Sequence, residues 1–505
     1  MILVVDFGSQ TAHLIGRRLR ELGVVVEYAY PEEVLEVVKR KGPLGIILSG
    51  GPAGVYEKDA PTIDKKIFSL GIPILGICYG CQLMAHILGG KVESADKEYG
   101  PEMLDLRNNS GIFSVPKKRF SVYMSHGDTV IELPSGFEVV GSTKKVKFAA
   151  IQNLKNKYFG VQFHLEAYHT KYGTEILKNF ATLICGETLK SLKLDPNKII
   201  EEVKLKIGEK KVIAAVSGGV DSTVAAYLIG KAVGKNLIPV YVESGLMRPE
   251  TEKRVRSIFT RLVKADLVVV DAKLKFMKSL KGITDPEEKR KTIGKLYIDI
   301  FQEQAKKHKD VSFLAQGTIY SDVIESKGSK HASHIKSHHN VGGLPKSIGF
   351  KLLEPLRSYY KDEVRKLGAL AGLPEEVISE QPFPGPGYAV RVRGEVTPER
   401  LSQVKMADKI VLEEIKAADL FGKVFQCFAV MSGAYSTAVK GDGRVFAEVV
   451  AIRAYESEDI MTSQVARIPY EVLQKMSSRI VNEVPNISRV VYDITTKPPA
   501  TMEWE

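Results

Sequence analysis

The chain has 505 residues, which is too long for one hydrophobic core and predicts about three domains. Its 44% hydrophobic and 26% charged residues are typical of a water-soluble globular protein. No apolar run approaches the ~18 residues of a membrane-spanning helix, and the N-terminus, with an acid at Asp6, lacks the features of a signal peptide. Four cysteines argue against a disulfide framework, so we expect a cytoplasmic protein that does not enter a membrane.

The net charge of +12 permits nucleic-acid binding but suits acidic small molecules equally well. Lysines are spread along the chain, as in residues 190–211 and 264–295, and no basic stripe is interleaved with aromatic residues. We therefore expect phosphate-rich small substrates and no nucleic acid.

In the first third of the chain, short apolar runs alternate with amphipathic stretches, which predicts an α/β domain. A strand at residues 46–48 ends in Ser-Gly-Gly-Pro, a turn that includes Gly51 and whose backbone amides can hold an oxyanion. A second strand at 73–77 leads into Cys78, and we place the start of the next helix at Leu83.

Cys78 has glycines on both sides at a strand-to-helix turn, the pattern of a nucleophile elbow that exposes a thiol near a helix N-terminus. With Cys81 it also fits a redox pair or half of a zinc site, although zinc would need a second cysteine pair. Downstream, His164 and Glu166 follow a strand, and on an extended segment their side chains share a face. Glu166 can then hold the imidazole that deprotonates Cys78.

Residues 76–82, 124–128 and 162–164 together resemble the class I glutamine amidotransferases. The resemblance implies a catalytic triad of Cys78, His164 and Glu166. Its further implied residues are the oxyanion-hole amides and the glutamine-binding group: Gly51, Tyr79, Gln82, Ser125, His126, Gly127 and Asp128. The family usually has proline between the histidine and the glutamate, whereas this chain has Leu165, which removes a backbone constraint on the glutamate.

In the middle third, an apolar strand at 212–216 leads into Ser-Gly-Gly-Val-Asp-Ser and then into a helix at 223–229. A Gly-Gly turn at a helix N-terminus makes an anion site, although a plain strand–helix turn can have the same composition. The loop lacks the Lys-Ser/Thr of a Walker A motif and is similar to the PP-loop of the N-type ATP pyrophosphatases. The resemblance implies these ATP-binding residues: Ser217, Gly218, Gly219, Val220, Asp221 and Ser222.

Further strands at 237–242, 267–271 and 314–318 predict a doubly wound nucleotide-binding sheet with its ligand at the carboxyl ends of the strands. Glu243 then belongs on the adenosine side, at a position where the relatives carry Asp. Before this sheet, residues 195–211 have a helical pattern and read as a helical linker or as the first helix of the domain.

Asp322 and Glu325 are spaced to share one face of a helix, suited to Mg²⁺ or to orienting a substrate. A polar loop with glycine hinges follows, in which Lys336 stands near His338 and His339. Zinc is disfavoured here because no cysteine is near and Lys336 would repel a cation. We interpret this loop as a lid that neutralises charge on a transferring phosphoryl group.

In the last third, three prolines and two glycines within residues 381–387 predict a domain boundary. The pattern beyond them predicts a small α+β unit, with strands at 389–394, 425–431, 445–453 and 489–495 and helices at 398–417 and 469–483. The tail at 497–505 carries a rigid Pro-Pro between Lys497 and Glu503, which suggests a chain end inserted into a site.

Taken together, the chain resembles the glutamine-hydrolysing GMP synthetases over nearly its whole length. The most specific motifs lie at residues 284–287, 335–340, 382–387 and 497–505. The resemblance implies that O2 of XMP attacks the α-phosphate of ATP, and that ammonia from glutamine then displaces AMP from adenyl-XMP to leave GMP. It implies Mg²⁺ at Asp221 as the cofactor and a homodimer through the C-terminal unit. The implied XMP-binding residues are Arg248, Asp322, Glu325, Gln426, Arg489, Lys497, Thr501 and Glu503.

The predicted fold class is α/β: an open mixed sheet, a doubly wound PP-loop sheet and a small α+β unit. The predicted domains are the amidotransferase at 1–188, a helical linker at 189–209, the ATP pyrophosphatase at 210–384 and the XMP-binding and dimerisation domain at 385–505. Two alternatives remain open at this stage. One is another amide-forming synthetase, such as an NAD or asparagine synthetase, and the other is a nucleotide-binding regulatory protein with an inactive glutaminase.

Overall fold

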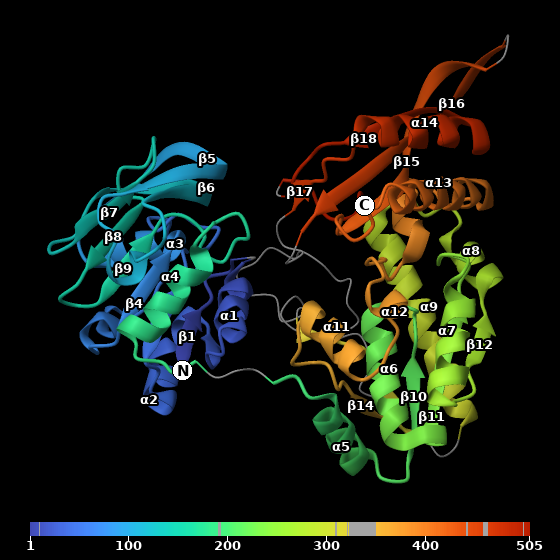
Figure 1. Cartoon of the computed structure of the whole chain (residues 1–505), viewed down its shortest axis with the longest axis horizontal. Helices are drawn as coiled ribbons and strands as arrows, with labels where there is room; N and C mark the ends of the chain where they lie inside the picture. The colour runs from blue at the N-terminus through green and yellow to red at the C-terminus, as the bar shows by residue number, and fades with distance from the viewer. Residues whose placement is uncertain are drawn as a thin grey trace. The chain divides into compact units, whose positions relative to one another are not determined.

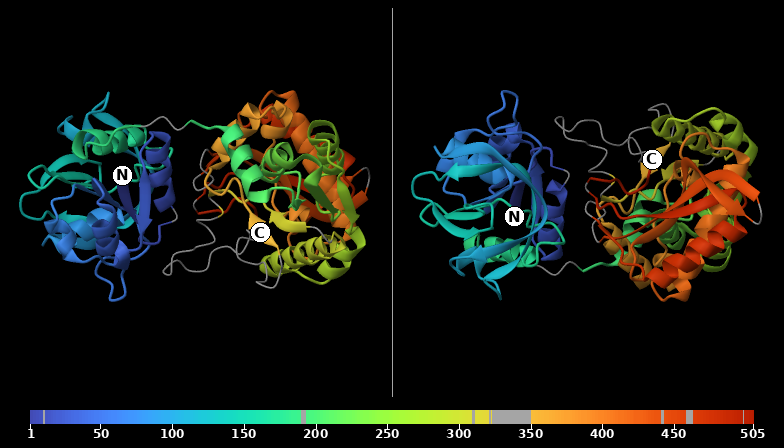
Figure 2. Two further views of the ribbon diagram at one scale, coloured as in Figure 1. Left: turned by 90° about the horizontal axis from the view of Figure 1, so that it is seen from below. Right: turned by 90° about the horizontal axis from the view of Figure 1, so that it is seen from above.

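The computed structural model describes residues 1–9, 11–189, 193–308, 311–320, 322, 350–440, 443–457, 463–497 and 499–505. The chain divides into two compact units (Figures 1 and 2): the first holds Met1–Lys193, and the second holds the described residues from Leu194 onward. No helix among these described residues is long and apolar enough to cross a membrane.

The described strands of the first unit form one nine-stranded sheet in the order β2-β1-β3-β4-β9-β8-β7-β5-β6. The five strands from β2 to β9 are parallel, and the remaining pairs are antiparallel. Their bounds are Ile2–Val5 (β1), Val26–Ala29 (β2), Gly45–Leu48 (β3), Ile74–Ile77 (β4), Lys91–Leu106 (β5), Arg119–Glu132 (β6), Glu138–Ser142 (β7), Ala150–Asn153 (β8) and Tyr158–Val161 (β9).

Helices cover both faces of this sheet, which explains why its central parallel strands are apolar at every position. Alternate residues of β1 enter two separate cores, one shared with α1 and α4 and the other shared with α2 and α3. The helices are Ala12–Glu21 (α1), Val34–Lys41 (α2), Tyr79–Ile87 (α3) and Gly173–Asn179 (α4).

The predicted strands at 46–48 and 73–77 are confirmed as β3 and β4, although β4 begins at Ile74. The predicted helix start at Leu83 is wrong, because α3 begins at Tyr79, directly after Cys78. The extended segment predicted through His164 is also wrong: β9 ends at Val161, and the residues beyond it form bends and turns.

The second unit contains a five-stranded parallel sheet in the order β12-β11-β10-β13-β14, which confirms the doubly wound fold. Its strands are Lys211–Ala215 (β10), Leu237–Glu243 (β11), Val268–Asp271 (β12), Val311–Ala315 (β13) and Lys351–Leu353 (β14). Its helices are Pro196–Ile207 (α5), Val220–Val233 (α6), Thr251–Ile258 (α7), Lys273–Leu280 (α8), Pro286–Lys307 (α9), Lys361–Leu370 (α11) and Glu375–Ile378 (α12). The strand predicted at 314–318 is shifted along the chain, because β13 begins and ends three residues earlier. Gln316 and Gly317 therefore lie in the loop that follows β13.

The last part of the chain forms a second sheet of this unit, in which β15 and β16 are antiparallel and β18 joins β16 in parallel. Its elements are Pro398–Ala417 (α13), Gln426–Lys440 (β15), Gly443–Glu456 (β16), Gln464–Val465 (β17), Tyr470–Glu483 (α14) and Ile487–Asp493 (β18). The predicted bounds of α13 are confirmed. In Figure 1 the far ends of β15 and β16 extend past α14 as a two-stranded ribbon.

The strand predicted at 389–394 is wrong, because Gly387–Arg391 forms a 3-10 helix. All five of its residues are buried, and the Arg391 guanidinium reaches carboxylates on other elements, which a half-exposed strand would not allow. One core joins α8 and α9 to α13, β15 and β16, so the two sheets of this unit are packed together.

Candidate active sites

Cys78 is held in a strained turn between β4 and α3. Its φ of 49° lies in the left-handed region, which residues other than glycine rarely adopt. The turn needs its glycines: a Cβ at Gly80 would come within 2.3 Å of the Leu48 carbonyl oxygen, and one at Gly76 within 2.6 Å of the Gly80 carbonyl oxygen. The thiol therefore stands at the N-terminus of α3.

Cys78, His164 and Glu166 lie together, as the sequence predicts. His164 Nδ1 is 2.7 Å from Glu166 Oε1, the imidazole is hydrogen-bonded with the Cys78 thiol, and Thr11 Oγ1 donates to the same carboxylate oxygen at 2.7 Å. Glu166 has no exposed surface, and Leu165 packs into the core beside it. The glutamate thus reaches the histidine without the family's proline.

Charge pairing controls the protonation of this buried triad. Burial opposes a charged imidazole, but the Glu166 carboxylate and the hydrogen bonds to Cys78 and Glu166 raise the pKa of His164 well above its usual value. Burial likewise raises the pKa of Glu166, and the facing imidazole more than offsets it, so the pKa of Glu166 is lowered. His164 can therefore hold the proton that the thiol gives up.

Two polar groups contact the Cys78 thiol, and a hydrogen-bond chain continues from one of them. Its Sγ lies 3.6 Å from the Ser125 carbonyl oxygen and 3.7 Å from Gln162 Nε2. Gln82 Nε2 donates to the Asp128 carbonyl oxygen at 2.7 Å and to Gln162 Oε1 at 3.3 Å. Of the predicted glutamine-binding residues, Ser125 thus contacts the nucleophile directly, and Gln82 and Asp128 are connected to it through Gln162. Gln162 is not among the predicted site residues, although it belongs to the Gln-Phe-His motif that the sequence shows.

The loop after β3 lies beside the nucleophile turn, where an oxyanion hole is expected. Gly80 N donates to the Ser49 carbonyl oxygen at 3.0 Å. A Cβ at Gly50 would stand 3.1 Å from the His164 ring, and one at Gly51 3.2 Å from the Tyr79 ring. The backbone of Gly51 is thereby held close to the first turn of α3.

His126 differs from the other predicted glutamine-binding residues, because its imidazole is buried against Glu98 on β5. The two side chains are each 2% exposed, with 3.4 Å between His126 Nε2 and Glu98 Oε2. Burial lowers the pKa of His126 and raises the pKa of Glu98, so both groups favour their neutral forms. Gly127 follows His126 within β6.

The predicted phosphate loop connects β10 to α6 in the second unit. Ser217 Oγ and Ser222 Oγ are 3.0 Å apart, and the Ser217 amide donates to Ser222 Oγ at 3.3 Å. Gly218 has a φ of 83°, and a Cβ there would come within 2.4 Å of the Thr251 side chain. Ser217 and Gly219 are exposed, whereas the Val220 side chain packs into the core, so the loop presents its backbone to solvent.

Asp221 fits a magnesium ion brought by a nucleotide. Its Oδ2 binds Lys361 Nζ at 2.6 Å, and its buried Oδ1 has no hydrogen-bond partner among the described residues. Within the described ranges no group of three His, Cys, Asp or Glu residues could hold a metal. Mg²⁺ in proteins is often bound by one or two carboxylates together with substrate phosphates, so a single free carboxylate oxygen suits it.

A cavity of about 220 Å³ opens at the carboxyl ends of β10, β11 and β13. Its walls include Ser217 and Gln316 and, from α9, Tyr297 and Phe301, whose rings stack with 6.4 Å between centroids. Such a cavity suits a planar aromatic ring with polar edges. Glu243, predicted at this side, accepts the Gly245 amide through Oε1 at 2.8 Å and so shapes the loop after β11.

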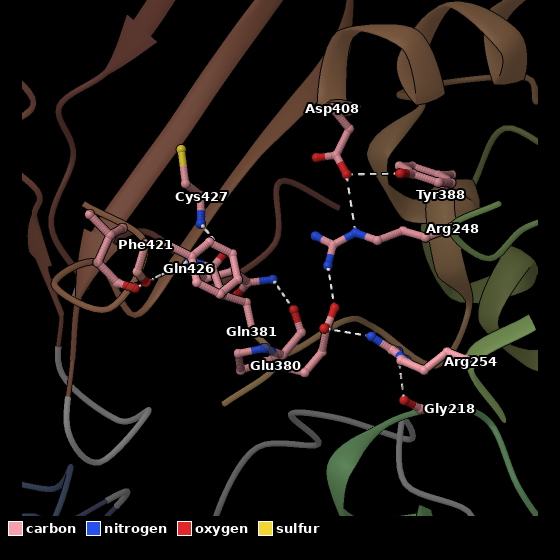
Figure 3. A network of polar contacts seen from close by, with 12 residues as sticks. Gly218, Arg248, Arg254, Glu380, Gln381, Tyr388, Asp408, Phe421, Gln426 and Cys427 are labelled. Carbon is pink, nitrogen blue, oxygen red and sulfur yellow. Dashed lines mark hydrogen bonds and ion pairs between the residues drawn. The ribbon is translucent and has the colours of Figure 1, made fainter. Parts of the chain in front are cut away.

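A network of charged side chains contains three of the predicted XMP-binding residues. Arg248 Nε pairs with Asp408 Oδ2 at 3.3 Å (Figure 3). Arg391 pairs with Asp408 Oδ1 at 3.4 Å. Arg391 also binds both carboxylate oxygens of Glu503, at 3.0 and 3.1 Å. Gln426 Nε2 donates to Glu503 Oε1 at 3.2 Å, so the tail is tied to this network.

The other predicted XMP-binding residues lie elsewhere. Arg489 is exposed on β18, and Lys497 is buried with its backbone paired to Ser463. The Thr501 carbonyl accepts from Arg453 at 2.7 Å, and Asp322 Oδ2 accepts the Ile319 amide at 2.9 Å. Four predicted residues lie outside the described residues: Glu325, Lys336, His338 and His339.

Family models match three parts of the chain: glutamine amidotransferase class-I at residues 3–184, NAD synthase at 195–281 and the GMP synthase C terminal domain at 413–504. Among curated relatives, GMP synthase (glutamine-hydrolyzing) of Nitratiruptor sp. is 51% identical, covering 100% of this chain and 99% of the relative. The protein of the same name from Brachyspira hyodysenteriae is 48% identical at 100% and 99% coverage, and that from Lactobacillus acidophilus 49% at 100% and 98%. The chain therefore belongs to the family of glutamine-hydrolysing GMP synthases.

Proposed function

We propose that this chain makes GMP from XMP, ATP and glutamine at the two sites described above. The observation that carries the proposal is that a buried Cys78–His164–Glu166 triad and an exposed phosphate loop occur in one chain. The first site releases nitrogen from an amide, and the second activates an oxygen so that this nitrogen can replace it.

In the first site, the Cys78 thiolate attacks the amide carbon of glutamine, and the Gly51 and Tyr79 amides face the oxyanion. His164 takes the thiol proton and gives it to the leaving ammonia, which leaves a glutamyl thioester. Water activated by His164 then hydrolyses the thioester to glutamate and regenerates the thiol. Gln82, Ser125, His126, Gly127 and Asp128 would surround the substrate.

In the second site, O2 of XMP attacks the α-phosphorus of ATP, and the bond from the α-phosphorus to the bridging oxygen breaks to release pyrophosphate. Ser217, Gly219 and Ser222 would hold that pyrophosphate. Mg²⁺ held by Asp221 would supply positive charge against the phosphates. Ammonia then attacks C2 and AMP leaves, which gives GMP. Lys336, His338 and His339 stay predicted as the lid over this transfer.

Arg248 is the best-supported contact to XMP, because its buried Nη2 has no partner among the described residues while its other nitrogens are paired. Gln426 and Glu503 lie in the same network, and the remaining XMP residues keep their predicted roles. We further propose the four-part domain division of the sequence analysis, a homodimer through residues 385–505, and a cytoplasmic location.

The test is a single incubation of the protein with XMP, ATP, Mg²⁺ and glutamine. We expect GMP, AMP, pyrophosphate and glutamate in equal amounts. Glutamate release without GMP would contradict the synthetase role. Formation of AMP and pyrophosphate only when nicotinate adenine dinucleotide or aspartate replaces XMP would assign a different acceptor.

A further inference from the structure

A chain of alternating charges connects the phosphate loop to Arg248 within the second unit (Figure 3). Arg254 Nη2 donates to the Gly218 carbonyl oxygen at 2.9 Å, and its Nη1 lies 2.5 Å from Glu380 Oε2. The other oxygen of this carboxylate accepts from Arg248 Nη1 at 3.1 Å. Arg248 Nε then pairs with Asp408. Glu380 therefore bridges Arg254, an arginine of α7 that binds the phosphate loop, and Arg248, an arginine of the proposed acceptor site.

At one end of the bridge, Arg254 fixes the direction of a backbone amide in the phosphate loop. A peptide unit is planar and trans, so holding the Gly218 carbonyl points the Gly219 N–H to the opposite side. Among the described residues, that N–H has only a long contact of 3.4 Å to Ser217 Oγ. It therefore remains available to a phosphate oxygen, and Arg254 determines where it points.

At the other end, Glu380 and Phe383 orient the Arg248 guanidinium. The guanidinium carbon lies 4.8 Å from the Phe383 ring centroid, and the carboxylates of Glu380 and Asp408 take its Nη1 and Nε. This leaves Nη2 buried and unpartnered among the described residues, as a donor for a ligand. A shift of Glu380 would rotate this donor.

We propose that Glu380 is a positioning residue that couples nucleotide binding at the phosphate loop to acceptor binding at Arg248. A phosphate bound to Gly219 N–H fixes the peptide that Arg254 holds, and Glu380 carries that constraint to Arg248. The side chains of Arg248, Glu380 and Arg254 are 14%, 21% and 30% exposed, so water screens the bridge less than it screens a surface pair. The proposal rests on the proposed function, because it takes the two ligands to be ATP and XMP.

The test measures equilibrium binding of XMP to the full-length protein, with and without Mg²⁺ and α,β-methylene-ATP, which cannot be cleaved between the α- and β-phosphates. In the wild type we expect the analogue to tighten XMP binding within the usual coupling range of about 5–150-fold. In Glu380→Gln we expect this factor to fall close to one. Glu252→Gln is the matched control, because it removes a carboxylate that pairs with Arg256 at 2.8 Å on α7, outside the bridge. The control should keep the wild-type factor.

A second variant, Arg254→Lys, breaks the bridge at its other end while keeping the charge. It should lose the same coupling, and the double variant Arg254→Lys/Glu380→Gln should lose no more, since both changes cut one connection. If Glu380→Gln weakened XMP binding by the same factor with and without the analogue, the proposal would be overturned, because Glu380 would then only hold Arg248 in place. Additive losses in the double variant would overturn it as well. A wild type that neither binds XMP nor makes GMP would instead defeat the proposed function.

Discussion

The two candidate sites solve opposite electrostatic problems. The glutaminase triad is buried, and Cys78, His164 and Glu166 find their charge partners in one another. The phosphate loop is exposed at Ser217 and Gly219, and Asp221 keeps one oxygen without a partner among the described residues. Glutamine's amide is neutral, so the triad must create its own charge in a dry setting, whereas ATP brings charge that the loop must neutralise.

The two sites differ in when their charged groups find partners. In the triad the partners are present before the substrate binds, whereas in the phosphate loop the substrate supplies them. Buried charges that lacked internal partners would destabilise the fold strongly, so the triad has to be assembled in advance. In the phosphate loop, the exposed Ser217 and Gly219 carry no such cost, and Asp221 Oδ1, a buried oxygen with no partner among the described residues, marks where a ligand belongs. The predictions below separate the two sites by breaking one at a time.

The largest effect is expected from Cys78→Ala, which removes the nucleophile. Formation of GMP from glutamine should fall by on the order of 10⁴-fold or more, because no thioester can form. Formation of GMP from high ammonium at alkaline pH should remain near the wild-type rate. The control is Cys81→Ala: Cys81 is fully buried, and desolvation raises the pKa of its thiol far above the usual range, so it cannot serve as a thiolate. Loss of the ammonium reaction in a folded Cys78→Ala protein would contradict the two-site division.

The second effect is that of Glu166→Gln on the pH dependence of glutaminase. The carboxylate raises the pKa of His164, so its loss should move the basic limb of the rate profile to lower pH. The measurement is the rate of glutamate release from about pH 6 to about pH 10. Glu138→Gln, which removes a carboxylate bonded to Gln152 at 2.7 Å, should leave the limb unchanged.

The His164–Glu166 pair also predicts in which direction the stability of the fold changes with pH. The raised pKa of His164 stabilises the fold below the unfolded pKa of histidine, and this contribution is lost as pH rises through the raised value. The lowered pKa of Glu166 stabilises the fold above the unfolded pKa of glutamate, and this contribution is lost as pH falls through the lowered value. Glu166→Gln should make the thermal unfolding temperature of the full chain depend less on pH in both of these ranges. An unchanged pH dependence of the unfolding temperature would show that the pair does not titrate as described.

The third effect concerns Asp221→Asn, which keeps the shape of the side chain and removes its charge. Formation of AMP and pyrophosphate should fall by about 10²–10³-fold with both nitrogen sources, because Mg²⁺ and pyrophosphate handling is common to both routes. Glutamate release should persist. Recovery of the synthetase rate with ammonium alone would contradict the assignment of Asp221 to the phosphate site.

These sites differ in how far the sequence predicts them. The Cys78 turn, the phosphate loop and α13 follow from local patterns, because a Gly-flanked turn and a helical period are readable from neighbouring residues. The start of α3 at Tyr79 does not follow, because the strained φ of Cys78 lets the helix begin four residues before its apolar period is apparent.

The residues that the sequence misses are mostly buried charges in apolar stretches. Arg391 stands among Tyr388, Ala389 and Val392 and is fully buried, and Asp408 occupies a buried position of α13. Both interrupt an apolar pattern, and that interruption is the signal in the sequence that such residues have partners. Arg391 pairs with Glu503, 112 positions away, and with Asp408, 17 positions away on α13, and no local period shows either pairing.

The smallest expected effect belongs to the tail, and the structure changes how it should be tested. The sequence alone predicts that deleting residues 497–505 strongly raises the KM for XMP. The structure shows that deletion would also remove the carboxylate partner of the buried Lys289, which is Glu505, and one of the two carboxylate partners of the buried Arg391, which is Glu503. Removing one partner of a buried ion pair typically destabilises a protein by about 3–5 kcal/mol, so a truncated protein would confuse folding with binding.

Glu503→Gln avoids this difficulty, because the amide oxygen can still accept one bond from Arg391. The change weakens a charge-assisted contact worth about 1.5–3 kcal/mol, so we expect the KM for XMP to rise by about 10–100-fold, with a smaller change in kcat. Trp504→Phe is the matched control in the same tail, since it removes only the indole bond to Asp493 at 2.9 Å. Equal KM values for XMP in Glu503→Gln and Trp504→Phe would show that the tail closes the core of the second unit and takes no part in binding the acceptor. A selective rise in Glu503→Gln would place the end of the chain among the groups that XMP completes, in contrast to the triad that needs no ligand to be complete.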